Sequence, residues 1–471
     1  SLISDILELP ANIIVEIIPQ ITVQIAHSDS LIRNVVARIL MKFGEKHYQA
    51  LFYPLKLYEH CDAAKAKASH DILLSLHKLH KEEAADANLF VDGMLSAAIS
   101  WFEMWIIALD TASKAHHDNN IQKMDKILNH MFAQYDKPKC DLDRLFIRKH
   151  DQMIKQCRSL FNEHSGRSIR SMWDVFKHLF SQLNDRVKRL ELILLPKVSE
   201  QLATKRGFKI AVPGTYSVLH SVPNLECIEP ALQVLGTQQH PRCVFMISSS
   251  GEKVKFLLKG NEDIRLDQRV MQFFTLINSI MNRIRTTREL GAQIVKYAII
   301  PLSPMAGLIT WVTGADTLHQ MISEHRLLHN TLQNIEFSIL EDKVGLFFNN
   351  LTFAQKLETF REISRECEAN EIRDALWSRA PNAAMWMSQS LNFTVTTALM
   401  SMVGYVIGLG DRHPSNIMVQ RETGRVIHID FGDSFESTIM RASFPEMVPF
   451  RLTRMIVNAL DSSTIEGIFR K

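Results

Sequence analysis

The stretch GLGDRHPSNIMVQRETGRVIHIDFGD, residues 408–433, decides how the rest of the chain is interpreted. Within it, Asp411 precedes Asn416 by five residues, and Asp430 opens an Asp-Phe-Gly triplet. Two apolar runs of β-forming residues flank a polar turn at 422–424, so we predict a hairpin. That hairpin would return Asp430 towards the loop that holds the other two residues.

Phosphoryl transfer from ATP requires this combination of side chains. A carboxylate near the attacking hydroxyl acts as the base, and oxygen ligands hold the magnesium ions that neutralise the triphosphate. We therefore predict that Asp411 is the catalytic base and that Asn416 and Asp430 are ligands of Mg²⁺ or Mn²⁺. Protein kinases share this Asp-to-Asn spacing in the motif His-Arg-Asp-x-x-x-x-Asn. Here the histidine follows the aspartate instead, as His413.

The composition is that of a globular chain with several domains. Its 471 residues exceed what one core usually holds, and 46% are hydrophobic against 22% charged. The net charge of +3 is too small to favour nucleic acid or an anionic membrane as the main partner. The six cysteines show no metal-ligand spacing, which indicates free thiols in a reducing compartment. No apolar run is long enough for a transmembrane helix, and no signal-peptide pattern opens the chain.

Hydrophobic periodicity changes near residue 205. Before it, helical spacing predicts a helical solenoid and then a four-helix bundle, with helices at 11–25, 31–43, 47–59, 63–80, 90–115, 119–134, 142–164 and 169–195. After it, a period near two indicates strands at 208–212, 227–234, 243–247, 254–258, 295–300 and 308–312, with a helix at 263–283. From about 317 the chain is predicted to be mostly helical. A small sheet followed by a larger helical part is the layout of a two-lobed kinase.

Several further motifs resemble one family. Asp-Arg-His-x-x-Asn followed by His-Ile-Asp-Phe-Gly is similar to the phosphatidylinositol 3-kinase-related kinases and differs from ordinary protein kinases. Matching segments lie at 256–260, 263–267, 301–303 and 449–453, and two more, at 103–105 and 211–216, look most like the target of rapamycin (TOR) group. The resemblance implies a fragment made of the C-terminal part of a FAT solenoid at 1–90, an FRB bundle at 91–190, a kinase N-lobe at 191–312 and a C-lobe at 313–471 that lacks the FATC segment.

The resemblance also implies a function. The chain would be part of a non-specific serine/threonine protein kinase that regulates cell growth in response to nutrients, with ATP and Mg²⁺ or Mn²⁺ as cofactors. Its partners would be protein substrates and TOR-complex subunits, including a β-propeller subunit on the kinase C-lobe. A cytoplasmic location is expected, with peripheral association with endomembranes such as the lysosome or vacuole. Neither nucleic-acid binding nor a transmembrane segment is expected.

Further site residues follow from the same resemblance. His413 would be the partner of the catalytic aspartate near the transferred phosphate, although a role in bracing the loop explains it equally well. Lys259 would reach the α- and β-phosphates, held by a carboxylate such as Asp267, with Leu266 in place of the family's usual glutamine. A serine-rich turn would cover the phosphates through its backbone and the Ser249 hydroxyl. The residues expected around the adenine are Tyr297, Trp311, Val312, Met418 and Ile429.

The fourth helix of the predicted bundle carries two apolar stripes. Helical spacing places one set in the core, namely Met172, Phe176, Leu179 and Leu183. A flanking stripe and the first helix would form an apolar groove, lined by Leu109, Ser113, Trp173 and Phe180. In TOR kinases this groove receives rapamycin with its immunophilin. His117 and Lys177 stand where that family usually has aromatic residues, so we predict weak binding of rapamycin–immunophilin.

Two other functions stay open, a phosphoinositide lipid kinase and a pseudokinase scaffold. The segment 430–451 is expected to line the substrate site and has a formal charge of −2, from Asp430, Asp433, Glu436 and Glu446 against Arg441 and Arg451. This balance would repel a phosphorylated inositol head group, so a protein substrate is favoured. The pseudokinase function is disfavoured because the base, both metal ligands and the lysine are all present.

Overall fold

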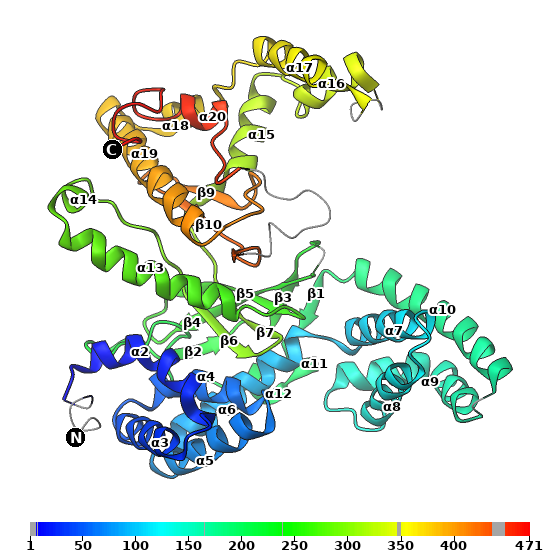
Figure 1. Ribbon diagram of the computed structural model, residues 1–471. Helices are drawn as coiled ribbons and strands as arrows, with labels where there is room; N and C mark the ends of the chain where they lie inside the picture. The colour runs from blue at the N-terminus through cyan, green and yellow to red at the C-terminus, as the bar shows by residue number, and fades with distance from the viewer. Residues whose placement is uncertain (1–5, 7, 164, 238, 346–349, 436–447) are drawn as a thin grey trace. The chain divides into compact units, whose positions relative to one another are not determined.

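The computed structural model describes residues 6, 8–163, 165–237, 239–345, 350–435 and 448–471. The chain divides into two compact units, Ser1–Gln268 with Ala298–Trp311, and Arg269–Tyr297 with Val312–Lys471. The first unit holds a helical region, a helical bundle and an antiparallel sheet, and the second is mainly helical with a small sheet (Figure 1). A helical N-terminal region followed by a kinase-like α+β region is the fold class predicted from the sequence.

The N-terminal helical region follows the predicted periodicity closely. Its elements are α2 (Ala11–Val23), η1 (Gln24–Ala26), α3 (Ser30–Gly44), α4 (Tyr48–Glu59), α5 (Ala63–Leu79) and α6 (Lys81–Ala98). Aspartates begin two of the helices: the side chain of Asp29 accepts from the main-chain N–H of Leu31, and that of Asp62 accepts from Lys65.

A four-helix bundle comes next, with a core of its own. It consists of α7 (Trp101–His117), α8 (Ile121–Tyr135), α9 (Asp141–Asn162) and α10 (Gly166–Lys188). The residues predicted for the core face of α10 are all buried, namely Met172, Phe176, Leu179 and Leu183. One predicted helix was wrong, because 90–115 is divided between α6 and α7. The break occurs where Ser100 and Glu103 form a capping box, which satisfies the first N–H groups of α7 and starts a new helix.

Seven described strands form the larger sheet, in the order β1-β3-β4-β5-β7-β6 with β2 beside β4. They are β1 (Leu192–Leu194), β2 (Leu225–Ile228), β3 (Ala231–Val234), β4 (Arg242–Ser248), β5 (Lys253–Gly260), β6 (Ile299–Ser303) and β7 (Ala306–Thr310), with short helices α11 (Leu195–Val198) and α12 (Glu200–Thr204) after β1. All the pairings are antiparallel. The predicted strands 243–247 and 254–258 are confirmed as the β4–β5 hairpin.

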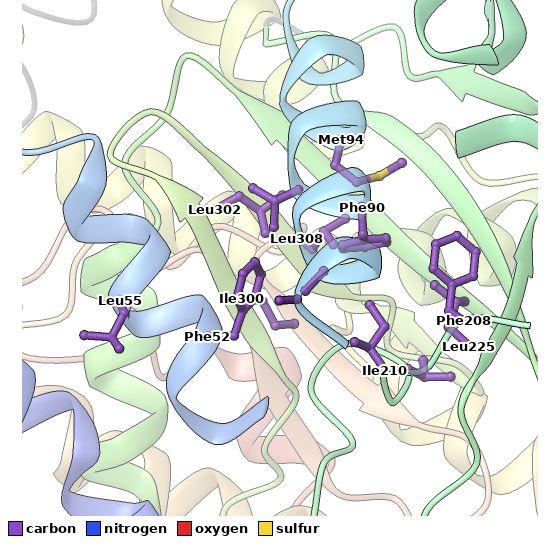
Figure 2. Packing of buried hydrophobic residues seen from close by; sticks show 14 of the residues in the cluster. Phe52, Leu55, Phe90, Met94, Phe208, Ile210, Leu225, Ile300, Leu302 and Leu308 are labelled. Carbon is purple, nitrogen blue, oxygen red and sulfur yellow. The ribbon is translucent and has the colours of Figure 1, made fainter. Parts of the chain in front are cut away.

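One face of this sheet shares a core with the N-terminal helices. Phe90 and Met94 of α6 lie among Ile300 and Leu302 of β6 and Leu308 of β7 (Figure 2). Each of these side chains is at most 6% exposed. The sheet therefore depends on the helical region for the burial of one of its faces.

Three further predictions of secondary structure were wrong in the first unit. The segment 208–212 is a loop, because the N–H groups of Lys209 and Ala211 donate to side chains of distant helices over 2.8 Å each. The segment 227–234 is two strands interrupted at Pro230, which has no N–H to donate. The fourth bundle helix was expected to reach residue 195, but it ends at Lys188, and 192–194 pair with β3.

The second unit contains most of α13 (Arg265–Arg283) and the elements that follow it. These are α14 (Arg285–Glu289), β8 (Ala315–Thr317), α15 (Leu318–Leu328), α16 (Ile335–Val344), α17 (Phe353–Glu366), α18 (Glu371–Arg379), α19 (Ala383–Val406), β9 (Ile417–Gln420), β10 (Val426–His428) and α20 (Arg454–Asn458). The predicted hairpin is confirmed as β9 and β10, and β8 pairs with the other edge of β9. Among the described helices, none is by itself long and apolar enough to span a membrane; α6 and α7 meet that criterion only together, as a pair bent by 57°.

Candidate active site

The predicted base and metal ligands lie in the loop between α19 and β9 and just after β10. The side-chain Nδ2 of Asn416 donates to the main-chain oxygen of Asp411 over 3.0 Å. The main-chain N–H of Ile429 donates to the main-chain oxygen of Asn416 over 3.1 Å, and Asp430 follows directly. The structure thus brings the three residues together, as the hairpin predicted, while their chemical roles stay predictions.

Arg412 joins the two sides of this site. Its guanidinium donates to the main-chain oxygens of Gly410 over 2.7 Å and Ile429 over 2.9 Å, and also to those of Asn416 and Asp430. It also lies 5.9 Å from the ring centroid of Phe431. One buried side chain therefore fixes both the loop with the predicted base and the segment with the predicted metal ligand.

Two aspartates of the site have left-handed backbone conformations. The φ angle is 54° at Asp411 and 62° at Asp430, a region that few residues other than glycine adopt. Such conformations cost about 1–3 kcal/mol and occur mainly where the surrounding structure holds them in place. Here the bonds of Arg412 supply that restraint. Both aspartate side chains are solvent-accessible, so a substrate or ion can reach them.

His413 lies beside the predicted base. Its Nδ1 accepts from the main-chain N–H of Ser415 over 3.2 Å, so in the neutral ring the proton is on Nε2. Nε2 is 4.0 Å from a carboxylate oxygen of Asp411, and the two side chains are about half exposed. This geometry allows His413 to orient Asp411 or to contact a phosphate. A catalytic role and a role in bracing the loop therefore both stay open.

The predicted metal ligands suit Mg²⁺ or Mn²⁺. Because the Nδ2 of Asn416 is engaged with Asp411, its amide oxygen is the atom left to face a ligand. Magnesium usually takes one or two protein oxygens and completes its octahedron with water and phosphate oxygens. No group of three or more His, Cys, Asp or Glu with metal-binding geometry occurs among the described residues.

The residues predicted around the adenine are divided between the two units. Tyr297, Val312, Met418 and Ile429 lie in the second unit and are each partly buried. The hydroxyl of Tyr297 donates to the main-chain oxygen of His428 over 3.4 Å, which ties it to the hairpin. Burial, and then the positive charge of Arg412, lower the pKa of His428 to about 3, so this ring is neutral.

The first unit holds the predicted phosphate-binding residues. Lys259 is near the end of β5, and its Nζ donates to an oxygen of Glu262 over 2.6 Å. Asp267, the partner expected for this lysine, is buried in the first turn of α13. Trp311 has the Nζ of Lys255 3.5 Å from its ring centroid, on the sheet face that Lys259 shares.

Ser249 lies in the tight turn between β4 and β5. Its Oγ accepts from the main-chain N–H of Asn224 over 3.1 Å, and its own N–H donates to the main-chain oxygen of Asn224 over 2.8 Å. Gly251 in the same turn has a φ of 84°, which a side chain would disfavour. The hydroxyl therefore holds the turn in place and keeps its own proton available for a phosphate oxygen.

The residues predicted to line the bundle groove differ in exposure, and a histidine packs against one of them. Trp173 and Phe180 are partly buried, Ser113 is exposed, and Leu109 is 2% exposed within the bundle core. The ring of His116 stacks on Trp173 with centroids 5.6 Å apart. The two unusual positions, His117 and Lys177, are both exposed, and the side chain of Lys177 is 79% exposed beside Asp174.

Sequence reasoning missed two residues of the site, Arg412 and Glu262. Arg412 stands inside the motif that predicted the loop, and an arginine between two functional residues was the available signal. Its role depends on carbonyl groups that only the folded chain brings together. Glu262 lies three residues after Lys259 in the turn before α13, so an acidic residue close in sequence to the lysine was the signal there.

Comparisons with known proteins identify similar families and relatives. The family described as phosphatidylinositol 3- and 4-kinase matches residues 253–471, and the FKBP12-rapamycin binding domain matches residues 94–185. The serine/threonine-protein kinase TOR of Oryza sativa subsp. japonica is 35% identical, covering 96% of this chain and 19% of the relative. The serine/threonine-protein kinase TOR of Arabidopsis thaliana is 36% identical, covering 96% of this chain and 19% of the relative. The serine/threonine-protein kinase mTor of Drosophila melanogaster is 33% identical, covering 100% of this chain and 19% of the relative.

The chain therefore spans about a fifth of the length of these curated relatives. A solved structure, the FAT and kinase domain of CtTel1, is similar in fold with a TM-score of 0.65 at 20% identity. It covers 98% of this chain, and the match covers 28% of that structure.

Proposed function

Because the chain belongs to the TOR group of phosphatidylinositol 3-kinase-related kinases, we propose that it is the catalytic part of a protein kinase that transfers the γ-phosphate of ATP to serine or threonine. The observation that carries the proposal is the bond from Asn416 Nδ2 to the main chain of Asp411, which couples the predicted metal ligand to the predicted base. The combination of kinase and FRB family matches supports the TOR type.

Each residue of the site then has a defined task. Asp411 accepts the proton of the substrate hydroxyl, and His413 holds that carboxylate or contacts the phosphate. Magnesium or manganese, held by Asn416 and Asp430, would neutralise the charge of the phosphates. Lys259 adds a positive charge for the α- and β-phosphates, and Arg412 keeps the loop in its strained conformation.

A protein substrate is favoured over a phosphoinositide by charge. The segment 430–451 has two more acidic than basic residues, which opposes an anionic head group. Part of this segment, residues 436–447 with Glu436, Arg441 and Glu446, lies outside the described residues. By analogy with the family, we propose TOR-complex subunits, including a β-propeller subunit, as partners and a cytoplasmic location at endomembranes.

The test is phosphate transfer by the full-length protein and its Asp411→Ala and Asp430→Ala variants. Removal of a general base costs about 10²–10⁴-fold in rate, so each variant should lose nearly all transfer to a serine- or threonine-containing protein. Loss of Asp430 should also weaken Mg·ATP binding, whereas loss of Asp411 should leave it nearly intact. Asp461→Ala, a change at an exposed position, is the control.

Two results would contradict the proposal. Activity within a few-fold of wild type in either variant would remove the assigned residue from the mechanism. Efficient, Asp411-dependent labelling of phosphatidylinositol in place of protein would establish the lipid-kinase alternative.

A further inference from the structure

The junction between α6 and α7, residues 98–103, makes two contacts with the strands around Lys259. The first is a buried ion pair between Glu103 at the start of α7 and Arg242 at the start of β4. Their side chains are 8% and 1% exposed. Glu103 also accepts from the N–H of Ser100 over 2.9 Å and from its hydroxyl over 2.7 Å, so the ion pair is part of the helix cap.

The second contact is a close approach at Gly260. A Cβ atom added there would lie 2.3 Å from the main-chain oxygen of Ala98 and 2.7 Å from a side-chain carbon of Ile99. Neither the oxygen nor the carbonyl carbon behind it can move without moving the end of α6. The last residue of β5 is therefore glycine because the backbone of the junction lies directly against the strand.

These two contacts bracket Lys259. Arg242 pairs with Leu258 in the β4–β5 register, and Gly260 is the next residue after the lysine. Leu258 and Gly260 face the buried side of the sheet, so the intervening Lys259 side chain emerges on the opposite side. A shift of the junction would thus move the backbone on both sides of Lys259.

Substitution of one member of this buried ion pair is expected to be strongly disruptive. Arg242 is fully buried, its Nη1 donates to the main-chain oxygen of His240 over 2.6 Å, and its Nε has no hydrogen-bond partner within the described residues. Removing one member of a buried pair leaves the other charge uncompensated, which is far more disruptive than the loss of an exposed pair.

We propose that Glu103, Arg242 and Gly260 are positioning residues that fix Lys259 for the phosphates of ATP and link its position to the first helix of the bundle. This inference rests on the proposed kinase function. Lys259 contacts phosphates that are present both before and during transfer, so its displacement weakens ATP binding without slowing the chemical step. The expected signature is a higher KM for ATP with a nearly unchanged kcat.

The experiment uses the full-length protein and the variants Glu103→Gln and Gly260→Ala. Each should raise both the KM and the directly measured Kd for ATP by about 5–50-fold, within the usual range of coupling between sites. The kcat and the KM for the protein substrate should change by less than about threefold. A double variant, Glu103→Gln with Arg242→Gln, removes both charges and keeps amide groups that can bond to one another. It should return the Kd to within about threefold of wild type.

Two matched controls separate positioning from general damage. Asp110→Asn breaks an exposed ion pair with Lys114 on the same helix, and Gly236→Ala adds a methyl group where no atom lies within 4 Å. Both should leave the Kd for ATP unchanged. The positioning role is overturned if the Kd for ATP is unchanged in Glu103→Gln, or if kcat and the affinity for ATP fall equally. It is also overturned if the double variant binds ATP no more tightly than Glu103→Gln.

The Kd measurement also separates this inference from the proposed function. A wild-type protein that binds ATP but transfers no phosphate would contradict the kinase assignment alone. An active wild-type protein whose Glu103→Gln variant binds ATP equally well would contradict the positioning role alone.

Discussion

Arg412 lies inside the loop that it stabilises, with a side chain 8% exposed. Its planar guanidinium reaches carbonyl groups on two segments, at Gly410 and Asn416 on one side and Ile429 and Asp430 on the other. A lysine ammonium is a compact charge without the planar arrangement of N–H donors of a guanidinium, so it cannot reach the carbonyl groups of both segments at once. The arginine thus holds the two left-handed aspartates in position, although it need not touch a substrate.

We predict that the variant Arg412→Lys keeps the positive charge but loses the hydrogen bonds that join the two segments. A misplacement of about 1 Å in a catalytic group can cost about 10²-fold, so kcat/KM for protein phosphorylation should fall by roughly that factor. The measurement is steady-state kinetics with both ATP and protein substrate varied. Arg425→Lys, on the same hairpin, is the control and should stay within about threefold of wild type. If the activity of Arg412→Lys equals that of the control, the loop keeps its conformation without the hydrogen bonds of the guanidinium.

At the scale of helices and strands, the sequence predicted what depends on local pattern. Helical periodicity placed the core face of α10, and the two apolar runs around the polar turn at 422–424 predicted the hairpin that brings Asp411, Asn416 and Asp430 together. Prediction from the sequence failed where contacts with residues distant in the chain determine the local structure. The strand β1 exists only because β3 pairs with it, and in the loop at 208–212 the N–H groups of Lys209 and Ala211 donate to side chains of α6 and α4.

The division between α6 and α7 had a local signal that was overlooked. Ser100 and Glu103 have the spacing of a capping box, but helical spacing of apolar residues across 90–115 predicted a single helix. For the candidate site, the proximity of Asp411, Asn416 and Asp430 was predictable from the motif and the hairpin that follows it. The supporting bonds of Arg412 and Glu262 were not, because they depend on where the folded chain places main-chain oxygens and the Lys259 side chain.

The surface between α7 and α10 yields a prediction about ligand binding. His117 and Lys177, where the resemblance leads us to expect aromatic residues, are exposed near the partly buried Trp173 and Phe180 of the predicted groove. At about 25 cal/mol per Å² of apolar area, two lost aromatic contacts reduce affinity for an apolar ligand by about one to three decades. We therefore expect the full-length protein to bind rapamycin–immunophilin weakly and a His117→Phe, Lys177→Tyr double variant to bind it more tightly.

Titration with the rapamycin–immunophilin complex, with immunophilin alone as the control, measures this difference. Lys188→Tyr adds an aromatic residue outside the groove, in the last turn of α10, and should not change the affinity. Tight binding by the unmodified protein, or no gain in the double variant, would contradict the assignment of the groove.

For the first unit as a whole, the shared core makes the helical region and the sheet interdependent. Apolar side chains of α4 and α6 and of β4 to β7 belong to one continuous buried cluster. Phe90 lies within it at 0% exposure, between Tyr53 of α4 and the sheet residues shown in Figure 2. A helical region and a sheet that share one core are expected to unfold together, as a single cooperative unit.

The variant Phe90→Ala tests this cooperativity. Removing a buried phenyl ring leaves a cavity and costs about 3–5 kcal/mol, whereas Leu74→Ala on α5, at 47% exposure, should cost well under half of that. Hydrogen exchange measures the consequence residue by residue. In Phe90→Ala, amide protection should fall by a similar free energy in α4, in α6 and in strands β5 and β7, because opening any one of them exposes the same core. Protection lost in the helices but retained in β5 and β7 would show two separate cores. In that case the sheet could hold Lys259 in place without the helical region, and the contacts at Glu103 and Gly260 would be its main connection to the bundle.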